Sequence, residues 1–309
     1  YFTKVLMSAE RKDLPISASV AVVGGGVTGL TAAFTLHKKY NLQDILVLEA
    51  EDRPGGNIET EREEGFVVEK GPNGFLDNVP ETLQLASELG LKPLPSSTSA
   101  RKRFLALNSG LVPVPTGPLS FLFSPLLSFS GKLRVFAEPF SRKAPPGDET
   151  VFAFAERRIG REAAQRLVDT MVLGVFAGDS RDLSLKAAFP RMAYLERTYG
   201  SLVKALLMLS LRSRSDARGG PAGPGGTLTS FPKGMSELIE ALARELEGKI
   251  LYNAPVRGLA TEGSRCVLLT PAGLVKAEKV LLAIPAPQAA RILQNSSPAA
   301  SQLLRSIPS

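Results

Sequence analysis

Short apolar runs separated by glycine-rich turns mark the first and last parts of the 309-residue chain. Residues 19–23, SVAVV, and residues 44–50, DILVLEA, predict buried strands, because apolar positions there follow one another without alternation. Between them, residues 24–29 predict a turn that leads into a helix extending to about Tyr40. A strand–helix–strand unit is right-handed by default, so we expect the two strands to be parallel.

The middle of the chain has a different pattern. Residues 103–115, RFLALNSGLVPVP, predict a hairpin with Asn-Ser-Gly at its turn. Helical periodicity dominates residues 117–211, and the Gly, Pro and Arg content of residues 212–226 predicts a solvated loop rather than a recruited basic arm. From Thr227 the strand-and-helix pattern returns. Its first helix is expected to place five apolar residues on one face: Met235, Leu238, Ile239, Leu242 and Leu246.

Composition excludes several kinds of site. Cys266 is the only cysteine and His37 the only histidine, which excludes a disulfide within the chain and Cys/His zinc sites. We expect Cys266 to be a buried structural thiol and His37 to lie at a solvated helix end. The net charge of +7 suits an anionic small substrate, an anionic membrane surface or nucleic acid. No basic run interleaves with aromatic residues, so we expect no nucleic-acid partner.

The apolar runs are too short to span a bilayer, which takes about 18 residues. The longest, Leu119–Phe129, is broken by Pro125 and fits either a cap over a core or a contact with a membrane surface. Both ends of the chain look arbitrary, with no Met at position 1 and no closing element at the end. We therefore expect an incomplete chain.

Gly24, Gly26 and Gly29 form a G-x-G-x-x-G motif between the first strand and its helix. The first glycine allows a tight turn, the second lets a pyrophosphate approach the backbone, and the third lets helix and strand pack closely. Glu49 ends the second strand, where a carboxylate accepts hydrogen bonds from an adenosine ribose and repels a 2′-phosphate. The motif therefore predicts an adenine dinucleotide other than NADP.

A second glycine pair distinguishes an FAD site from an NAD site. Arg53, Pro54, Gly55 and Gly56 directly follow the second strand. A backbone without Cβ atoms can lie there against another part of a long cofactor, and a guanidinium can meet its phosphates. An NAD site has no comparable need, so we predict FAD.

The string from Val20 to Gly56 resembles the amine-oxidase-type flavoproteins. Five later segments narrow the resemblance to the oxygen-dependent protoporphyrinogen oxidases, in the family's order and over nearly the whole chain: VVEKGPNGFLDN, RFLALNSGLVPVP, LGVFAGDSRDLSLKAAFP, GSLVKAL and SFPKGMSEL. Coproporphyrinogen oxidases share these segments, which do not separate the two activities.

The resemblance implies an α/β fold, with a Rossmann-like, hydroxybenzoate-hydroxylase-like FAD-binding domain and an inserted, mainly helical domain. The expected domains are an FAD-binding domain at 18–102 and 227–285, a substrate domain beginning at 103–116, a helical substrate and membrane-associating domain at 117–211, the loop at 212–226, and the start of a further, incomplete substrate domain at 286–309.

Site residues follow from the resemblance position by position. The ADP portion of FAD would be held by Gly24, Gly26, Gly29, Glu49, Arg53, Gly55 and Gly56. Gly71, Pro72 and Asn73 would pass near the flavin, and the backbone of Val256, expected in a strand, would meet adenine. Arg103 would pair with a substrate propionate, and Phe176, Ala177 and Gly178 would form a cavity wall, where the absent Cβ of Gly178 leaves room for a flat tetrapyrrole.

The implied reaction, a step of haem and tetrapyrrole biosynthesis, removes six electrons from protoporphyrinogen IX to give protoporphyrin IX and passes them to dioxygen. The alternative is the same oxidation of coproporphyrinogen III. The flavin carries the redox chemistry, so no catalytic side chain and no metal is expected. A membrane surface and a homodimer remain open as partners. The expected location is the cytoplasm or the inner face of a membrane, with an organelle left open. Because family chains extend further, we expect this stretch alone to bind FAD poorly and to turn over little.

Two rival interpretations remain. The first is another flavin amine oxidase or a carotenoid desaturase, against which the segments at 173–190 and 230–238 argue. The second is a non-catalytic binding protein on the same scaffold, like the Rab escort and GDP-dissociation-inhibitor proteins. The intact glycines and Arg53 argue against it, since a scaffold without flavin has no need of them.

Overall fold

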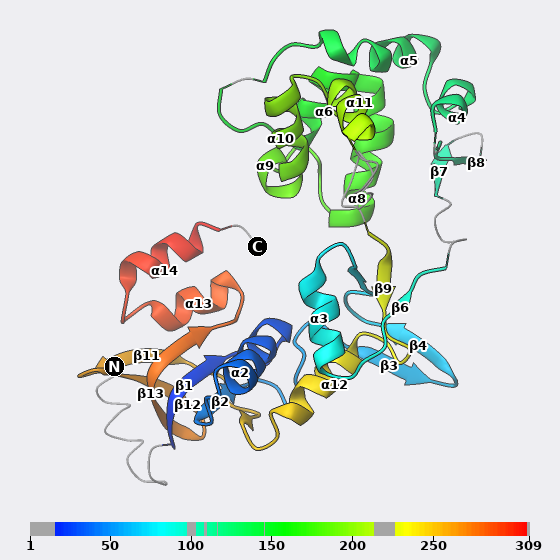
Figure 1. The fold of residues 1–309 in the computed structure, drawn as a ribbon. Coiled ribbons are helices and arrows are strands. Elements are labelled where there is room, and N and C mark those ends of the chain that lie inside the picture. Colours follow the sequence, from blue (N-terminus) through cyan, green and yellow to red (C-terminus); the bar gives the residue numbers. More distant parts are fainter. Residues whose placement is uncertain are drawn as a thin grey trace. The chain divides into compact units, whose positions relative to one another are not determined.

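The computed structural model describes residues 16–97, 103–107, 110–115, 117–144, 146–212 and 226–307. The chain forms two compact units (Figure 1). Unit 1 combines the chain up to Pro95 with the chain from Leu228 onward, and unit 2 is Ser96–Thr227. Most of the loop expected at 212–226, and the Asn108-Ser109 pair of the expected hairpin turn, lie outside the described residues.

A six-stranded sheet in the order β10-β2-β1-β13-β12-β11 forms the centre of unit 1. The neighbours from β10 to β13 pair in parallel, and β13, β12 and β11 pair antiparallel. The parallel pairing expected for the first two strands is confirmed. The strands are β1 (Ile16–Val23), β2 (Ile45–Leu48), β10 (Ile250–Leu251), β11 (Gly258–Glu262), β12 (Arg265–Thr270) and β13 (Gly273–Leu282).

Both faces of this sheet are buried, which explains the uninterrupted apolar runs. Val22 and Val47 point into one core, whereas Ala21 and Leu48 point into another on the opposite face, as the two-residue period of a strand requires. Helices α2, α3 and α12 contribute to the first core, and Ile292 of α13 to the second. The helices of unit 1 are α2 (Val27–Lys39), α3 (Pro80–Glu88), α12 (Ser236–Glu245), α13 (Ala286–Leu293) and α14 (Pro298–Arg305), the last packed on α13.

Two small antiparallel sheets complete unit 1. One pairs β3 with β4, and the other has the order β5-β9-β6 and joins the two chain segments of the unit. Their strands are β3 (Thr60–Glu63), β4 (Phe66–Glu69), β5 (Phe75–Leu76), β6 (Leu94–Pro95) and β9 (Leu228–Ser230). The apolar face expected around α12 is confirmed, since all five residues named for it are buried.

Two single residues differ from their expected surroundings. Cys266, in β12, is half-buried rather than buried, and it lies opposite Thr261 of β11 and Ala277 of β13 in the sheet. His37 lies in the last turn of α2 as expected, but it is also half-buried. Its Nδ1 lies 3.2 Å from the carbonyl oxygen of Leu42, so the loop after the helix covers part of the ring.

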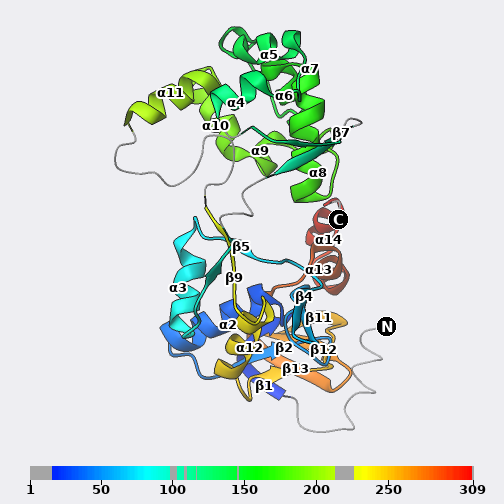
Figure 2. The ribbon, with the colours of Figure 1, turned by 90° about the vertical axis from the view of Figure 1, so that its right-hand side faces the viewer.

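The described residues of unit 2 form a hairpin and a set of helices (Figure 2). The hairpin expected from the sequence pairs β7 (Phe104–Leu107) with β8 (Gly110–Pro113). A π-helical segment, η3 (Ala164–Asp169), lies between α7 and α8. Such segments are rare and are often found at functional sites. The other elements are α4 (Pro118–Phe123), α5 (Phe129–Phe136), η2 (Glu138–Phe140), α6 (Val151–Ile159), α7 (Arg161–Ala163), α8 (Thr170–Phe176), α9 (Leu185–Ala188), α10 (Pro190–Tyr199) and α11 (Leu202–Arg212).

Candidate cofactor and substrate sites

The turn after β1 is built so closely that two of its glycines have no room for a side chain. Gly24 has φ +105°, and a Cβ there would lie 2.6 Å from the carbonyl oxygen of Ala283. A Cβ on Gly29, in the first turn of α2, would lie 1.9 Å from the carbonyl oxygen of Gly24. These contacts hold the turn between β1, α2 and the chain after β13, as the motif requires.

Gly26 differs from both, because a Cβ built on it meets no atom within 4 Å. It is the N-cap of α2, where no side chain caps the helix and the first turn holds no acidic residue. The first N–H groups of the helix and its dipole therefore face an open space that is bounded by glycine backbone. Such a space fits a phosphate group.

Glu49 directly follows β2 and is buried, with 7% of its surface exposed. Its carboxylate accepts hydrogen bonds from the backbone N–H of Gly25 at 2.7 Å and of Glu51 at 2.9 Å. The Glu49 side chain thus holds the first glycine turn in place. Each carboxylate oxygen keeps lone-pair capacity, which fits the expected contact with ribose hydroxyls.

The second glycine pair lies against the first turn. Gly55 donates its N–H to the carbonyl oxygen of Gly25 at 2.8 Å. Gly55 has φ +116° and Gly56 has φ +57°, and a Cβ on Gly55 would lie 2.7 Å from the carbonyl oxygen of Ile58. The sequence motifs at 24–29 and 53–56 therefore form one joined wall of backbone.

The Arg53 side chain contacts the loop that carries Gly55 and Gly56. Its guanidinium donates to the carbonyl oxygen of Gly56 at 3.1 Å and pairs with Glu59 at 3.0 Å and with Glu51 at 3.7 Å. The expected contact with cofactor phosphates thus remains a proposal, and the contacts present brace the loop that carries Gly55 and Gly56.

The segment expected near the flavin also meets this wall. A Cβ on Gly71 would lie 1.8 Å from the carbonyl oxygen of Asn57, so the two backbones touch. Lys70 donates its N–H to the carbonyl oxygen of Glu59 at 2.9 Å, which fixes the approach. Pro72 and Asn73, which follow, are exposed.

Val256 lies in the loop before β11 and not within a strand, which corrects the expectation. The loop is tied to the end of β2, because Ala254 donates its N–H to the carbonyl oxygen of Glu49 at 2.8 Å. Within the described part of the chain, the backbone groups of Val256 have no hydrogen-bond partner. A backbone donor and acceptor beside Glu49 suit the edge of an adenine ring.

Unit 2 contains a cavity of about 900 Å³. Residues of β7, α6, the η3–α8 region, α9 and α10 line it, and all but three of the lining residues are apolar or glycine. The exceptions are Arg103, Arg158 and Thr170. This size and lining are typical of a site for an apolar small molecule with a few fixed polar contacts.

Arg103, for which the resemblance implies a contact with a substrate propionate, lines the cavity and is exposed. Among the described residues, no carboxylate forms an ion pair with its guanidinium. An exposed, uncompensated cation beside an apolar cavity fits a ligand that carries a carboxylate at its edge.

The three other residues expected in the wall do not line this cavity. Phe176 packs edge-on against Phe189, with ring centroids 5.5 Å apart, and only Phe189 lines the cavity. Ala177 ends α8 in the left-handed conformation, with φ +50°. A Cβ on Gly178 would meet only the carbonyl oxygen of Phe176, at 3.7 Å, so the local packing leaves room for a side chain.

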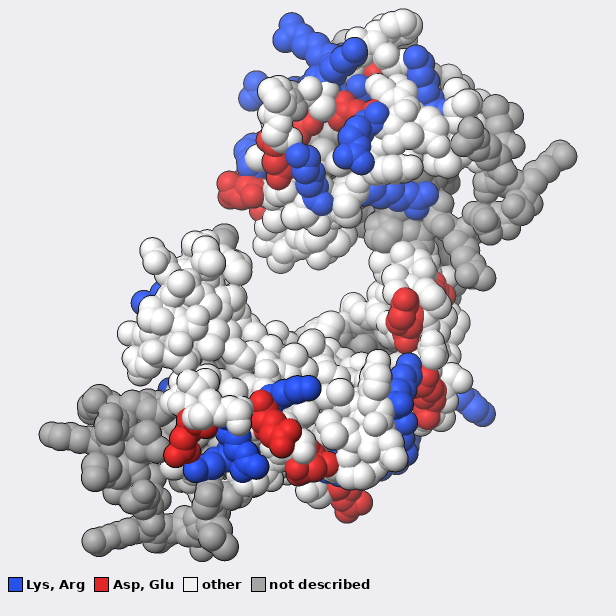
Figure 3. All heavy atoms as spheres, turned by 60° about the vertical axis from the view of Figure 1, so that its left-hand side comes forward, with Lys and Arg blue, Asp and Glu red and all other residues white. Residues whose placement is uncertain are grey.

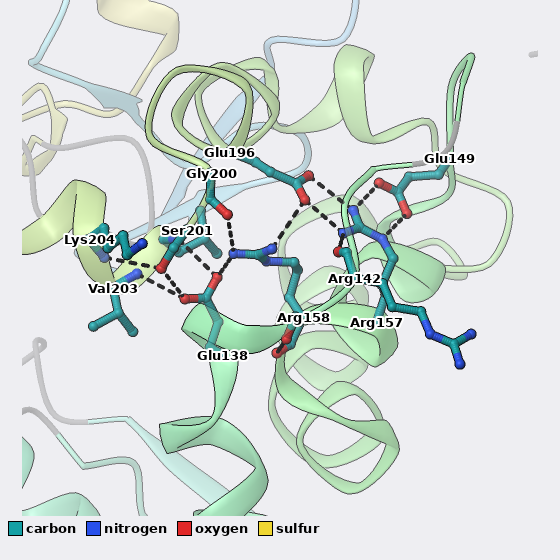
Figure 4. Close-up of polar contacts among 12 residues, drawn as sticks. Glu138, Arg142, Glu149, Arg157, Arg158, Glu196, Gly200, Ser201, Val203 and Lys204 are labelled. Carbon is teal, nitrogen blue, oxygen red and sulfur yellow. Dashed lines mark hydrogen bonds and ion pairs between the residues drawn. The ribbon is translucent and has the colours of Figure 1, made fainter.

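Sequence reasoning missed a buried ion-pair network in unit 2 (Figure 4). Arg158 and Glu138 are each 1% exposed and form an ion pair. The carboxylate of Glu138 also accepts hydrogen bonds from Ser201 Oγ at 2.6 Å and from the N–H groups of Leu202 at 2.9 Å and Val203 at 3.2 Å, at the start of α11. Burial alone raises the pKa of Glu138, but these hydrogen bonds and the charge of Arg158 outweigh it and hold the pKa below its ordinary value.

The second half of the network surrounds Arg157. Its guanidinium pairs with Glu149 at 2.5 Å and with Glu196 at 2.7 Å. Burial alone lowers the pKa of Arg157, whereas these two carboxylates raise it by a larger amount. Glu196 also lies 3.4 Å from Nη1 of Arg158, so both arginines share it. The signal in the sequence is the position of Arg158, seven residues after Val151 on the apolar face of α6.

The described residues hold no group of three or more His, Cys, Asp or Glu side chains that suits a metal ion. Within the same residues, no helix has both the length and the apolar composition needed to cross a membrane. The candidate site in unit 1 consists of glycine backbone, a helix N-terminus and Glu49, and the candidate site in unit 2 of an apolar cavity with Arg103.

The mixed sheet, the two joined glycine loops and Glu49 define a dinucleotide-binding fold of the flavoprotein type. Residues 27–309 match the family described as flavin containing amine oxidoreductase, and the chain belongs to this family. Family membership implies FAD as the cofactor, and the open space at Gly26, the Glu49 carboxylate and the free backbone of Val256 fit it.

Relatives include proteins of two activities. The rice protein named protoporphyrinogen oxidase, chloroplastic (Oryza sativa subsp. japonica) is 35% identical over 305 residues, which cover 94% of this chain and 56% of the relative. The coproporphyrinogen III oxidase of Bacillus subtilis (strain 168) is 31% identical over 301 residues, covering 92% of this chain and 63% of the relative. The chain thus spans less than two thirds of these relatives.

Solved structures agree on the fold. A crystal structure from Exiguobacterium sp. 255-15, provisionally named a protoporphyrinogen oxidase, has a TM-score of 0.76 at 27% identity, covering 92% of this chain and 62% of that chain. Cyclohexylamine oxidase from Brevibacterium oxydans IH-35A has a TM-score of 0.64 at 21% identity, covering 93% and 63% respectively, and shares the fold alone.

Proposed function

We propose that the full-length protein oxidises a porphyrinogen to the porphyrin, with FAD as cofactor and dioxygen as electron acceptor. The observation that carries the proposal is the cavity of unit 2, an apolar space of about 900 Å³ with the uncompensated cation of Arg103 beside it. A porphyrinogen has an apolar macrocycle and peripheral propionates, which match these two features. The named activities of the rice and Bacillus subtilis relatives support the same reaction class.

The residues have separate tasks in this proposal. Gly26 and the N-terminus of α2 bind the cofactor phosphates, and Glu49 binds the adenosine ribose. When bound, FAD supplies the two-electron oxidation chemistry. The cavity of unit 2 orients the macrocycle and excludes water, and Arg103 pairs with a propionate.

Charge is distributed unequally between the two units, which bears on the substrate. Residues 96–227 contain 19 Lys or Arg and 10 Asp or Glu, whereas the rest of the chain contains 18 and 20. Lys and Arg accordingly predominate on the face of unit 2 seen in Figure 3. A positive field of this kind raises the rate at which an anionic substrate arrives.

The first test is the absorption spectrum of the purified full-length protein, followed in air by porphyrin fluorescence after addition of a porphyrinogen. We expect flavin bands and a fluorescence increase faster than spontaneous oxidation. A colourless protein that leaves porphyrinogens at the spontaneous rate, even with FAD added, would overturn the proposal and favour a non-catalytic binding protein.

We also propose that unit 2 contacts a membrane surface. Large apolar side chains of α4, α5 and η2 are exposed, with Phe123 at 81%, Phe129 at 76% and Phe140 at 91%. Lys132 and Lys143 lie on or beside the same elements. Flotation with liposomes of anionic lipid tests this contact, and protein that stays in the soluble fraction at low salt would refute it.

A further inference from the structure

The cavity of unit 2 differs from the surface of that unit in its charge. Although unit 2 carries a surplus of Lys and Arg, Arg103 and Arg158 are the only charged residues among the described part of the unit that line the cavity. No Asp or Glu among the described residues lines it. What the cavity accepts therefore depends on how far each of these two cations is already neutralised.

Arg158 is neutralised by carboxylates of the unit itself. Its guanidinium pairs with Glu138 and lies 3.4 Å from Glu196, and Nη2 also donates to the carbonyl oxygen of Gly200 at 3.1 Å. Nε and Nη1 make no hydrogen bond within the described residues, since the contact with Glu196 has the distance but not the geometry of one. Figure 4 shows carboxylates on either side of this guanidinium, so a further carboxylate beside Arg158 would meet two negative charges.

The charge of Arg103, unlike that of Arg158, is not neutralised by a described carboxylate. Arg103 is exposed, and none of the described carboxylates pairs with it. The third polar residue of the lining, Thr170, already donates its hydroxyl to the carbonyl oxygen of Arg166 at 3.0 Å. The cavity thus has one uncompensated cation, and this cation lies where a paired carboxylate stays in contact with water.

Porphyrinogens differ in how many of their edges bear carboxylates. In protoporphyrinogen IX the two propionates are on adjacent rings, and the opposite edge has only methyl and vinyl groups. In coproporphyrinogen III every ring bears a propionate, so no edge is free of charge. Transfer of an unpaired carboxylate into an apolar cavity is strongly unfavourable.

We infer that the cavity of unit 2 takes the carboxylate-free edge of a tetrapyrrole and so selects protoporphyrinogen over coproporphyrinogen. This inference rests on the proposed function and decides between the two activities found among the relatives. The apolar wall rejects the extra propionates, and Arg103 alone binds one carboxylate at the exposed side.

The test compares the full-length holoenzyme on the two porphyrinogens. We expect kcat/KM to be at least tenfold higher for protoporphyrinogen, and protoporphyrin to bind at least tenfold more tightly than coproporphyrin in a fluorescence titration. Equal values, or a preference for the tetracarboxylate, would overturn the inference while the proposed function stands. Loss of both activities beside a bound flavin would instead refute the proposed function, and the inference with it.

A pair of variants tests the cause of the selection. Met171→Arg places a permanent cation in the apolar wall, and Leu173→Arg places the same charge two residues further along α8, outside the lining and 63% exposed. We expect Met171→Arg to shift the ratio of the two porphyrin affinities at least fivefold toward coproporphyrin. The ratio of Leu173→Arg should equal that of the wild type. A shift of equal size in both variants would show that surface charge, and not the cavity, sets the preference.

Discussion

Gly55 donates its backbone N–H to the carbonyl oxygen of Gly25 at 2.8 Å, and this bond joins two loops that are about 30 residues apart in sequence. The joined wall requires glycine, because Gly55 has φ +116° and a Cβ would lie 2.7 Å from the carbonyl oxygen of Ile58. We therefore expect Gly55→Ala to lower FAD affinity at least tenfold in the full-length protein, measured by flavin fluorescence titration.

The matched control is Gly65→Ala, at the turn between β3 and β4. Gly65 also has positive φ, +83°, but a Cβ there meets no atom within 4 Å. It should lower the free energy of unfolding by about 1 kcal/mol through backbone strain and leave FAD affinity unchanged. If both variants bound FAD with similar affinity, the joined wall of Gly25 and Gly55 would have no role in cofactor binding.

Gly26→Ala tests cofactor binding without a large effect on folding. Gly26 has φ −71°, and its Cβ would project into open space, so the loss of stability should be about 1 kcal/mol or less. The same methyl group would occupy the space assigned to the cofactor phosphates. We expect a melting temperature of the apoprotein close to that of the wild type, together with an FAD affinity lowered at least tenfold. Unchanged affinity would place the phosphates elsewhere.

Arg103→Leu tests substrate binding at the cavity. Because Arg103 is exposed and makes no ion pair with the described residues, its loss should leave the melting temperature unchanged. We expect KM for the porphyrinogen to rise about tenfold, as for the loss of a charge-assisted hydrogen bond. Lys143→Leu removes an exposed cation of unit 2 that does not line the cavity, and its KM should match the wild type.

The buried pair of Arg158 and Glu138 predicts non-additive effects on stability. Arg158→Met leaves the carboxylate of Glu138 buried without its partner, which should cost about 3–5 kcal/mol of unfolding free energy. The double variant with Glu138→Leu removes both charges, and we expect it to recover most of that loss. Urea unfolding followed by circular dichroism measures both. Equal losses in the single and double variants would show that the charges do not interact.

The pH dependence of stability follows from Glu138. Its pKa is lower in the folded state than its ordinary value of 4.5, so the unfolded state binds the proton more readily. The stabilisation is complete above pH 4.5 and is lost as the pH falls through the folded-state pKa. We expect the stability of Glu138→Gln to fall less steeply than that of the wild type as the pH drops below 4.5 in an acid titration. Parallel titration curves would assign the acid sensitivity to other carboxylates.

Local patterns predicted much of unit 1. The strand at residues 19–23, the glycine turn and the face of α12 each depend on residues within one or two turns of one another. The contact between Gly71 and Asn57 and the loop position of Val256 could not be derived in this way, because they depend on how separate strands meet. The glycine at position 71 shows that some backbone approaches closely there, but the residue types do not show which backbone it is.

Unit 2 was less predictable for a different reason. Its helices follow from periodicity, but the cavity forms where β7, α6 and α8 meet, and no single segment encodes it. The partners of Glu138 are 20 to 65 residues away in sequence. The wall expected around Phe176 was inferred from resemblance alone; in the structure Phe176 packs edge-on against Phe189, and only Phe189 lines the cavity of unit 2.

The pairing of β1 with β13 determines when this protein can first hold a nucleotide. Ribosomes deliver Gly24 early, but the carbonyl of Ala283 that packs against it arrives some 260 residues later, after all of unit 2. Unit 2 is one continuous stretch and is free to fold first, while the first segment of unit 1 waits with an unpaired strand edge. During synthesis, the edge of β1 that later pairs with β13 is therefore open, although β2 already covers the other edge, and an open strand edge can pair with another chain.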